Sequence, residues 1–166
     1  MKPGKSSETE IDVARFREVL GHFATGITIV TAMEDGEPVG FTCQSFVSLS
    51  LDPPLVAMAP GKSSTSWPRM VSAGAFGVNI LSSTQEALGR SFAVSGGDKF
   101  TGVLWEPGPV AGAPMLEGAL AWLECRLGAI HDAGDHELVT GRVLALGVGE
   151  GHPLLFYRGG FGTFSS

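Results

Sequence analysis

Residues 119–130 read ALAWLECRLGAI, and this stretch decides the class of fold. From residue 121 onward its residues divide into two alternating sets. One set is Ala121, Leu123, Cys125 and Leu127, and the other is Trp122, Glu124 and Arg126. Because successive side chains of an extended chain point to opposite faces, this alternation predicts a half-buried β-strand.

Further strand-like runs flank this segment on both sides. On the carboxyl side, HDAGDHE (131–137) predicts a turn into a second strand, LVTGRVLALGVG (138–149), and 152–164 predicts one or two more. On the amino side, 27–46 predicts a hairpin, ITIVTAM and VGFTCQSF around the turn EDGEP, and AFGVNIL predicts a buried strand.

Helices are few and short by comparison. We expect an amphipathic helix over 10–22, with Thr9 and Asp12 resembling a capping box, and short helices within 62–74 and 84–93. The Gly- and Pro-rich segment 94–114 predicts a long loop that carries the cluster DKF. Many strands, three peripheral helices and no regular βαβ alternation predict a mainly β fold, a barrel with helical decoration.

Composition limits the size and the class of the protein. With 166 residues, 43% hydrophobic and 17% charged, the chain predicts a flexible tail over 1–10 and one domain over 11–166. The net charge of −6 argues against binding to nucleic acid or to a membrane surface. Cys43 and Cys125 lie far apart, and no apolar run approaches the ~20 residues of a membrane span, so we expect a cytoplasmic protein.

Several familiar motifs fail when their full patterns are compared with the chain. Gly61, Lys62 and Ser63 match the end of a P-loop, but Val56 stands where its first glycine belongs. The glycines at 147–151 precede a strand-like run and not the helix of a dinucleotide fingerprint. The acidic and histidine residues of 131–137 predict a solvated hairpin turn better than a metal site, so no metal is expected.

One set of polar residues is suited to a phosphorylated ligand. It comprises Thr42, Gln44, Ser45 and Ser48, then Lys62, Ser63 and Ser64. Hydroxyl groups, backbone amides and a lysine together can bind a phosphate. Serine and threonine also populate ordinary strand ends and helix caps, so the pattern alone leaves both interpretations open.

The order and spacing of seven segments resemble a known family. The segments are FATGITIVTA, GFTCQSFVSLSLDPPLV, FGVNIL, DKF, AWLECRL, GDHELVTGRV and PLLFYRGGFG. Together they resemble the flavin reductases that serve two-component flavin-dependent monooxygenases, over nearly all of 16–164. The resemblance implies an FMN-binding split barrel, a homodimer, and reduction of FMN or FAD by NADH or NADPH. It also implies a partner monooxygenase that receives diffusible reduced flavin.

The resemblance also implies a role for individual residues. The flavin would contact Thr42, Cys43, Gln44, Ser45, Ser48, Leu49, Ala59, Lys62, Ser63, Ser64, Lys99 and Phe100. The nicotinamide would lie near His136, the catalytic candidate, and near Tyr157, Arg158 and Gly159. Cys43 and Gln44 depart from the Val and Asn that similar proteins often carry, which puts these two flavin contacts in doubt.

Two alternatives stay open at this point. The chain could instead be a carrier or electron-transfer protein that holds flavin without turning it over, or a split-barrel oxidase acting on another small substrate, because a shared fold does not fix the reaction. His136 could be a turn histidine that is satisfied by local carboxylates.

Overall fold

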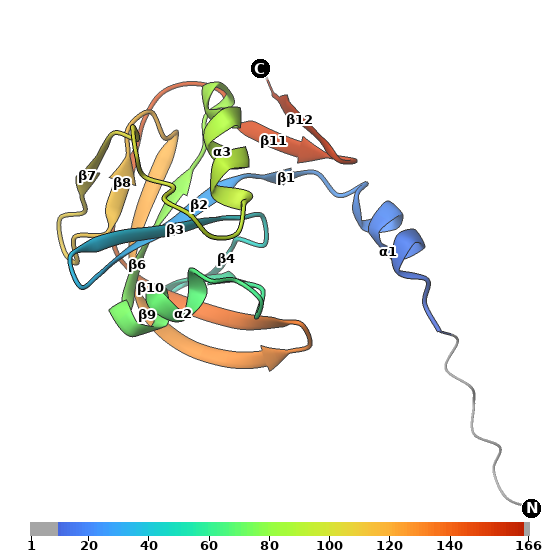
Figure 1. Cartoon of the computed structure of the whole chain (residues 1–166), viewed down its shortest axis with the longest axis horizontal. Helices are drawn as coiled ribbons and strands as arrows, with labels where there is room; N and C mark the ends of the chain where they lie inside the picture. The colour runs from blue at the N-terminus through green and yellow to red at the C-terminus, as the bar shows by residue number, and fades with distance from the viewer. Residues whose placement is uncertain (1–9, 165–166) are drawn as a thin grey trace, which may run out of the picture.

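The computed structural model describes residues 10–164, which form a mainly β structure around one seven-stranded antiparallel sheet (Figure 1). The strand order is β3-β2-β6-β9-β10-β5-β4. The strands are β2 (Thr28–Glu34), β3 (Glu37–Cys43), β4 (Val47–Leu51), β5 (Pro54–Met58), β6 (Ala75–Ile80), β9 (Ala121–Ala133) and β10 (His136–Val148). The outer strands β3 and β4 do not pair with each other, so the sheet stays open, as predicted for a split barrel.

Smaller elements surround this sheet. Two further sheets are formed by β1 (Thr25–Gly26), β11 (Leu154–Tyr157) and β12 (Gly160–Thr163), and by β7 (Trp105–Pro107) and β8 (Pro114–Leu116). The helices are α1 (Val13–Leu20), α2 (Trp67–Ala73), the 3-10 turn η1 (Ser83–Gln85) and α3 (Glu86–Ala93). All three predicted helices are therefore present, although α2 begins only at Trp67. None of the helices between residues 10 and 164 combines the length and hydrophobicity that crossing a bilayer requires.

Strand β2 contributes to two hydrophobic clusters, one on each of its faces. Ile29 packs with Leu81 and Phe92, whereas Val30 packs with Phe76 in the other cluster. Burying each large aliphatic side chain contributes about 1.5–3 kcal/mol. This two-sided burial explains why two apolar residues, Ile29 and Val30, stand next to each other in the strand, where a half-exposed strand would alternate apolar and polar side chains.

The prediction for β9 needs one correction. The polar face of the strand is not simply solvated, because Glu124 is completely buried. Its carboxylate accepts hydrogen bonds from the backbone amides of Val110 (2.7 Å), Ala111 (2.8 Å) and Ala113 (3.1 Å). A loop that precedes the strand thus folds over it, and sequence alternation alone cannot reveal that contact.

Helix α1 lies apart from the main body in Figure 1. Its N-cap is Asp12, whose carboxylate accepts from the amides of Ala14 (3.2 Å) and Arg15 (3.3 Å); the other predicted cap, Thr9, lies outside the described residues. The helix buries none of its own residues in this chain. Most of the predicted tail, residues 1–9, also lies outside the described residues.

Candidate functional site

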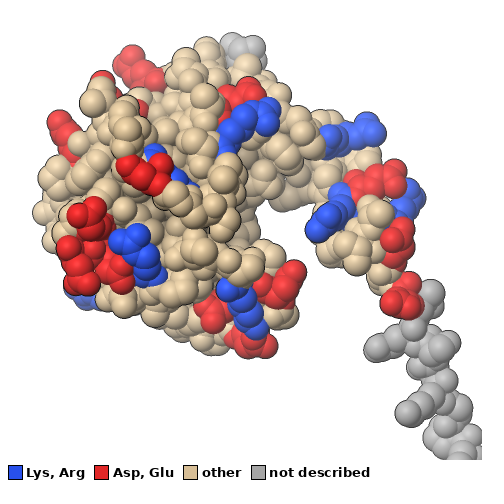
Figure 2. Space-filling view, viewed as in Figure 1, with Lys and Arg blue, Asp and Glu red and all other residues tan. Residues whose placement is uncertain are grey.

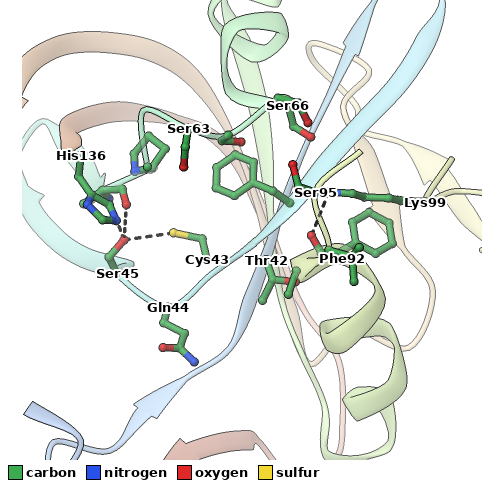
Figure 3. A pocket seen from close by; sticks show the side chains of 18 residues that line it. Thr42, Cys43, Gln44, Ser45, Ser63, Ser66, Phe92, Ser95, Lys99 and His136 are labelled. Atoms are coloured by element: carbon green, nitrogen blue, oxygen red, sulfur yellow. Dashed lines mark hydrogen bonds between the residues drawn. The ribbon is translucent and has the colours of Figure 1, made fainter. Parts of the chain in front are cut away.

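A cavity of about 660 Å³ lies where β3 ends, between the loop that follows β5 and the end of α3 (Figure 3). Its wall is formed by Phe41, Thr42, Cys43, Gln44, Ser45, Ala59, Pro60, Gly61, Ser63, Ser64, Thr65, Ser66, Phe92, Ala93, Val94, Ser95, Lys99 and His136. The volume is typical of sites that bind small molecules. The structure thus brings together most of the predicted site residues from four distant parts of the sequence.

Two hydroxyl groups at the end of β3 hold the cavity wall together. Ser45 Oγ donates to the carbonyl of Ala59 (3.0 Å) and accepts from its amide (2.9 Å), which joins the ends of β3 and β5. Thr42 Oγ1 donates to the carbonyl of Gly89 in α3 (2.6 Å). These side chains therefore shape the cavity, while the exposed Gln44 makes no side-chain hydrogen bond to another described residue.

Cys43 lies buried in the same wall, with its Sγ 3.3 Å from Ser45 Oγ. Burial raises the pKa of its thiol, and the hydrogen bonds around Ser45 offset only part of that effect. The side chain is therefore a neutral, compact surface and not a reactive thiolate.

The loop between β5 and α2 supplies a row of hydroxyl groups, at residues 63–66. Ser64 Oγ accepts from the amide of Trp67 (3.2 Å), and Ser66 Oγ donates to the carbonyl of Gly40 (3.0 Å). Ser63 Oγ makes no hydrogen bond to a described residue. Thr65 and Ser66 were not among the predicted site residues, although the run SSTS could have indicated them.

Lys99 provides the positive charge of the cavity. Its Nζ donates to the carbonyls of Phe92 (3.1 Å) and Gly40 (3.2 Å), and it forms no salt bridge with a carboxylate in residues 10–164. Partial burial lowers the pKa of the ammonium group. A half-buried cation with only neutral partners fits an anionic ligand group, which would restore the solvation it has lost.

The side chain of Lys62 points away from the cavity. Its Nζ contacts Asp132 and donates to the carbonyl of Gly134 (2.6 Å), both near the tip of the β9–β10 hairpin. It does not line the cavity, so a flavin contact by Lys62 stays a prediction that this arrangement does not favour.

The β9–β10 hairpin carries His136 into the cavity wall. The amide of Lys62 donates to the carbonyl of Asp135 and the amide of Glu137 donates to that of Pro60, both at 3.0 Å. Trp67 Nε1 also donates to the Glu137 carboxylate (2.5 Å), a contact that sequence reasoning missed. The hairpin tip is therefore fixed against the loop that carries the row of hydroxyl groups.

Asp135 orients the imidazole of His136. Its carboxylate lies 2.7 Å from Nδ1, and hydrogen bonding to that imidazole lowers the pKa of Asp135. The other nitrogen, Nε2, lies 3.7 Å from where a Cβ on Gly61 would stand, so the glycine leaves room beside it. With Nδ1 engaged, Nε2 is the nitrogen available to a ligand.

The remaining predicted residues lie outside this cavity. Ser48 and Leu49 are exposed on the edge strand β4, and Phe100 lines a neighbouring cavity. Tyr157 ends β11, and Arg158 and Gly159 form the turn to β12. This turn contacts the end of α1, where the Arg158 amide donates to the carbonyl of Gly21 (3.0 Å). Their ligand roles stay predictions. Sequence reasoning also missed Phe92, which gives no signal beyond an apolar position in a helix.

Comparison with known proteins identifies the family to which the sequence is similar. The family described as "Flavin reductase like domain" matches residues 20–165. The chain belongs to this family. Membership confirms the predicted family, the split-barrel fold and a flavin reductase as the class of enzyme.

Three relatives of this flavin reductase cover most of its length. It is 48% identical to the reductase subunit of a flavin-dependent monooxygenase from Rhodococcus jostii, over 94% of this chain and 80% of the relative. It is 45% identical to an FMN reductase (NADH) from Agrobacterium fabrum, over 90% and 85%. A Streptomyces globisporus NADH:FAD oxidoreductase, solved with NAD and FAD fragments, aligns at a TM-score of 0.87 with 37% identity, over 93% of each chain.

Proposed function

We propose that this flavin reductase oxidises NADH, reduces FMN or FAD in the cavity beside His136, and releases the reduced flavin to a separate monooxygenase. The observation that carries the proposal is the cavity itself. It joins a row of hydroxyl groups and Lys99, which pairs with no carboxylate of residues 10–164, to a histidine fixed at its rim. The names of the relatives support both the nicotinamide donor and the monooxygenase partner.

The chemistry of the cavity favours one orientation of the flavin. Beside Gln44 and Ser45 it adjoins a mostly apolar cavity that Ile27, Val47 and Ile80 help to line. The opposite end carries Ser66 and Lys99, which suit a phosphate. The ring of the flavin therefore lies toward Gln44, and its phosphate lies toward Lys99.

The chain's own contribution to the reaction is positioning. When bound, flavin and nicotinamide supply the hydride chemistry themselves. His136 stands at the ring end of the cavity, oriented by Asp135, and Nε2 holds the nicotinamide against the flavin. The hydrogen bonds between the hairpin and residues 60–62 fix the distance between the two binding regions, which is the geometric part of catalysis.

We extend the proposal to a homodimer, because α1 needs a partner. Its apolar side chains Val13, Phe16, Val19 and Leu20 are all more than half exposed. An isolated helix of eight residues is unstable in water. A second copy of the chain that packs on α1 would bury these side chains, and size-exclusion chromatography with light scattering tests this.

Figure 2 shows acidic and basic side chains interspersed on the visible face, with no continuous basic surface. This distribution fits small-molecule substrates better than a nucleic acid. Cys43 and Cys125 are both buried free thiols, which fits the reducing cytoplasm as the compartment.

Steady-state oxidation of NADH and NADPH tests the function, measured with purified protein and FMN, FAD or no added flavin. We expect rapid NADH oxidation that depends on added flavin. Protein that retains flavin through purification and oxidises no nicotinamide would overturn the proposal in favour of a flavin carrier.

A further inference from the structure

One residue of the β9–β10 hairpin, Glu137, is bonded to both ends of the segment 60–67. This segment runs from just beyond β5 to the first residue of α2, and it carries the row of hydroxyl groups along the cavity. The amide of Glu137 donates to the carbonyl of Pro60 (3.0 Å), and its carboxylate accepts from Trp67 Nε1 (2.5 Å). Glu137 therefore determines how the hairpin and this segment lie relative to each other.

The two ends of the segment are held in different ways. At the first end the contact is made by the backbone, where a β-bridge pairs Gly61 with His136 and backbone hydrogen bonds flank it. At the other end, the bond from Trp67 to Glu137 is the only hydrogen bond that joins residues 131–137 to residues 63–67 within the described part of the chain. The distance between the hydroxyl groups and the hairpin therefore depends, at this end, on one side-chain contact.

The environment of this contact favours a fixed geometry. Trp67 is only 4% exposed and packs in the larger hydrophobic cluster. An indole N–H can only donate, and a buried donor without an acceptor is costly. A hydrogen bond to a carboxylate is shorter and stronger than one between neutral groups. The contact between Lys62 and Asp132 at the tip of the same hairpin is solvent-exposed and provides a natural comparison.

Glu137 itself does not line the cavity, so its carboxylate acts on the site only through its neighbours. On one side it holds the segment whose hydroxyl groups face the flavin, and on the other it directly follows His136 in the hairpin. Transfer of a hydride requires the two reacting rings to be held at contact distance and in the correct orientation. A contact that sets the spacing of the two binding regions therefore affects the step that needs both ligands more than the binding of either one.

We propose that Glu137 is a positioning residue of the reductase, which through its bond to Trp67 holds His136 and the row of hydroxyl groups at the spacing that hydride transfer requires. The inference rests on the proposed function, since it requires flavin in the cavity and nicotinamide beside His136. Removal of the bond leaves every residue that lines the cavity in place and changes only how firmly the two regions are held together.

The test measures the Kd for FMN and the rate of flavin reduction in a single turnover at saturating NADH, followed by the loss of flavin absorbance. Glu137→Ala and Trp67→Phe each remove the bond, and we expect each to slow reduction about tenfold and to change the Kd for FMN by no more than about twofold. The double variant should be no slower than either single variant, because both remove the same contact.

Two variants serve as controls. Glu137→Gln keeps a carbonyl oxygen for the indole N–H, so it should retain more than about half of the wild-type rate. Asp132→Asn removes the exposed contact at the same hairpin tip, and its rate should equal that of the wild type. Thermal melts confirm that each variant folds, and the half-buried Glu137 provides a test that does not depend on a substitution in the core.

Four outcomes would overturn the inference. They are an unchanged rate in Glu137→Ala, a loss of FMN affinity as large as the loss of rate, additive losses in the double variant, and a Glu137→Gln protein as slow as Glu137→Ala. In each of them the wild-type protein still reduces flavin, so the proposed function survives. A wild-type protein that binds FMN and is not reduced by NADH would instead refute the proposed function itself.

Discussion

Replacing Lys99 and Lys62 separately by methionine tests which lysine binds the flavin phosphate. Lys99 Nζ lines the cavity and, within the described part of the chain, has only carbonyl partners, whereas Lys62 Nζ contacts Asp132 and donates to Gly134 at the hairpin. A hydrogen bond between charged groups contributes about 1.5–3 kcal/mol. We therefore expect Lys99→Met to raise the Kd for FMN about 10- to 150-fold.

Lys62→Met should change the Kd for FMN by no more than about twofold. The ion pair it loses is exposed, with Asp132 81% accessible, and such pairs contribute about 0–1 kcal/mol to stability. Methionine keeps most of the length of either lysine, so the two variants differ mainly in where the charge is removed.

The assay is titration of FMN fluorescence at one ionic strength, with thermal melts to confirm that each variant folds. Lys99→Arg should restore much of the affinity. Because burial lowers the pKa of Lys99, wild-type affinity should also begin to fall at a pH below that at which an ordinary lysine loses its proton. A larger loss in Lys62→Met than in Lys99→Met would refute the reasoning and restore Lys62 as the phosphate ligand.

Three further results are expected. His136→Ala should raise the KM for NADH about tenfold, which is more than it raises the Kd for FMN. Asp135→Asn should raise the KM for NADH by a smaller factor, because Asp135 acts only through the imidazole. Unchanged NADH kinetics in both variants would contradict the role of His136. Glu124→Gln replaces one of the two carboxylate oxygens by an NH₂ group that faces a backbone amide. It should lower the free energy of unfolding by about 1.5–3 kcal/mol and the Tm by about 5–10 °C. Glu106→Gln, at an exposed position, is the control, and equal Tm values for the two variants would contradict this prediction. Burial and the neighbouring Glu124 raise the pKa of Cys125 to about 12, and burial also raises the pKa of Cys43. At pH 8 neither thiol should therefore react with a thiol reagent until the protein is unfolded, and prompt labelling of the native protein would contradict this.

Short-range patterns in the sequence were sufficient to predict most of the fold. Alternation over 121–127 predicted β9, and the GDH segment lies at the hairpin turn as expected. The order of the segments identified the family, and the structure places Thr42 through Ser45, Ser63, Ser64, Lys99 and His136 around one cavity. Their individual roles as ligands stay predictions.

The features that could not be predicted all depend on which segments meet in three dimensions. Glu124 was expected on an ordinary polar face, but the loop at 108–113 covers it with three amides. Lys62 carries the same charge as Lys99 and lies within the same sequence pattern as the serines, yet its ammonium group points to a hairpin seventy residues away. No local pattern encodes these directions.

The backbone hydrogen bonds between the hairpin and residues 60–62 have a consequence for how the site moves. Because the two segments are joined through backbone amides and carbonyls, most side-chain substitutions leave these bonds in place, and opening one segment breaks its bonds to the other. Under the proposed function, we expect flavin that orders one segment to lower the entropy lost when nicotinamide orders the other. By thermodynamic reciprocity we then expect bound nicotinamide to favour flavin binding by the same factor, so that release of the nicotinamide weakens the binding of flavin.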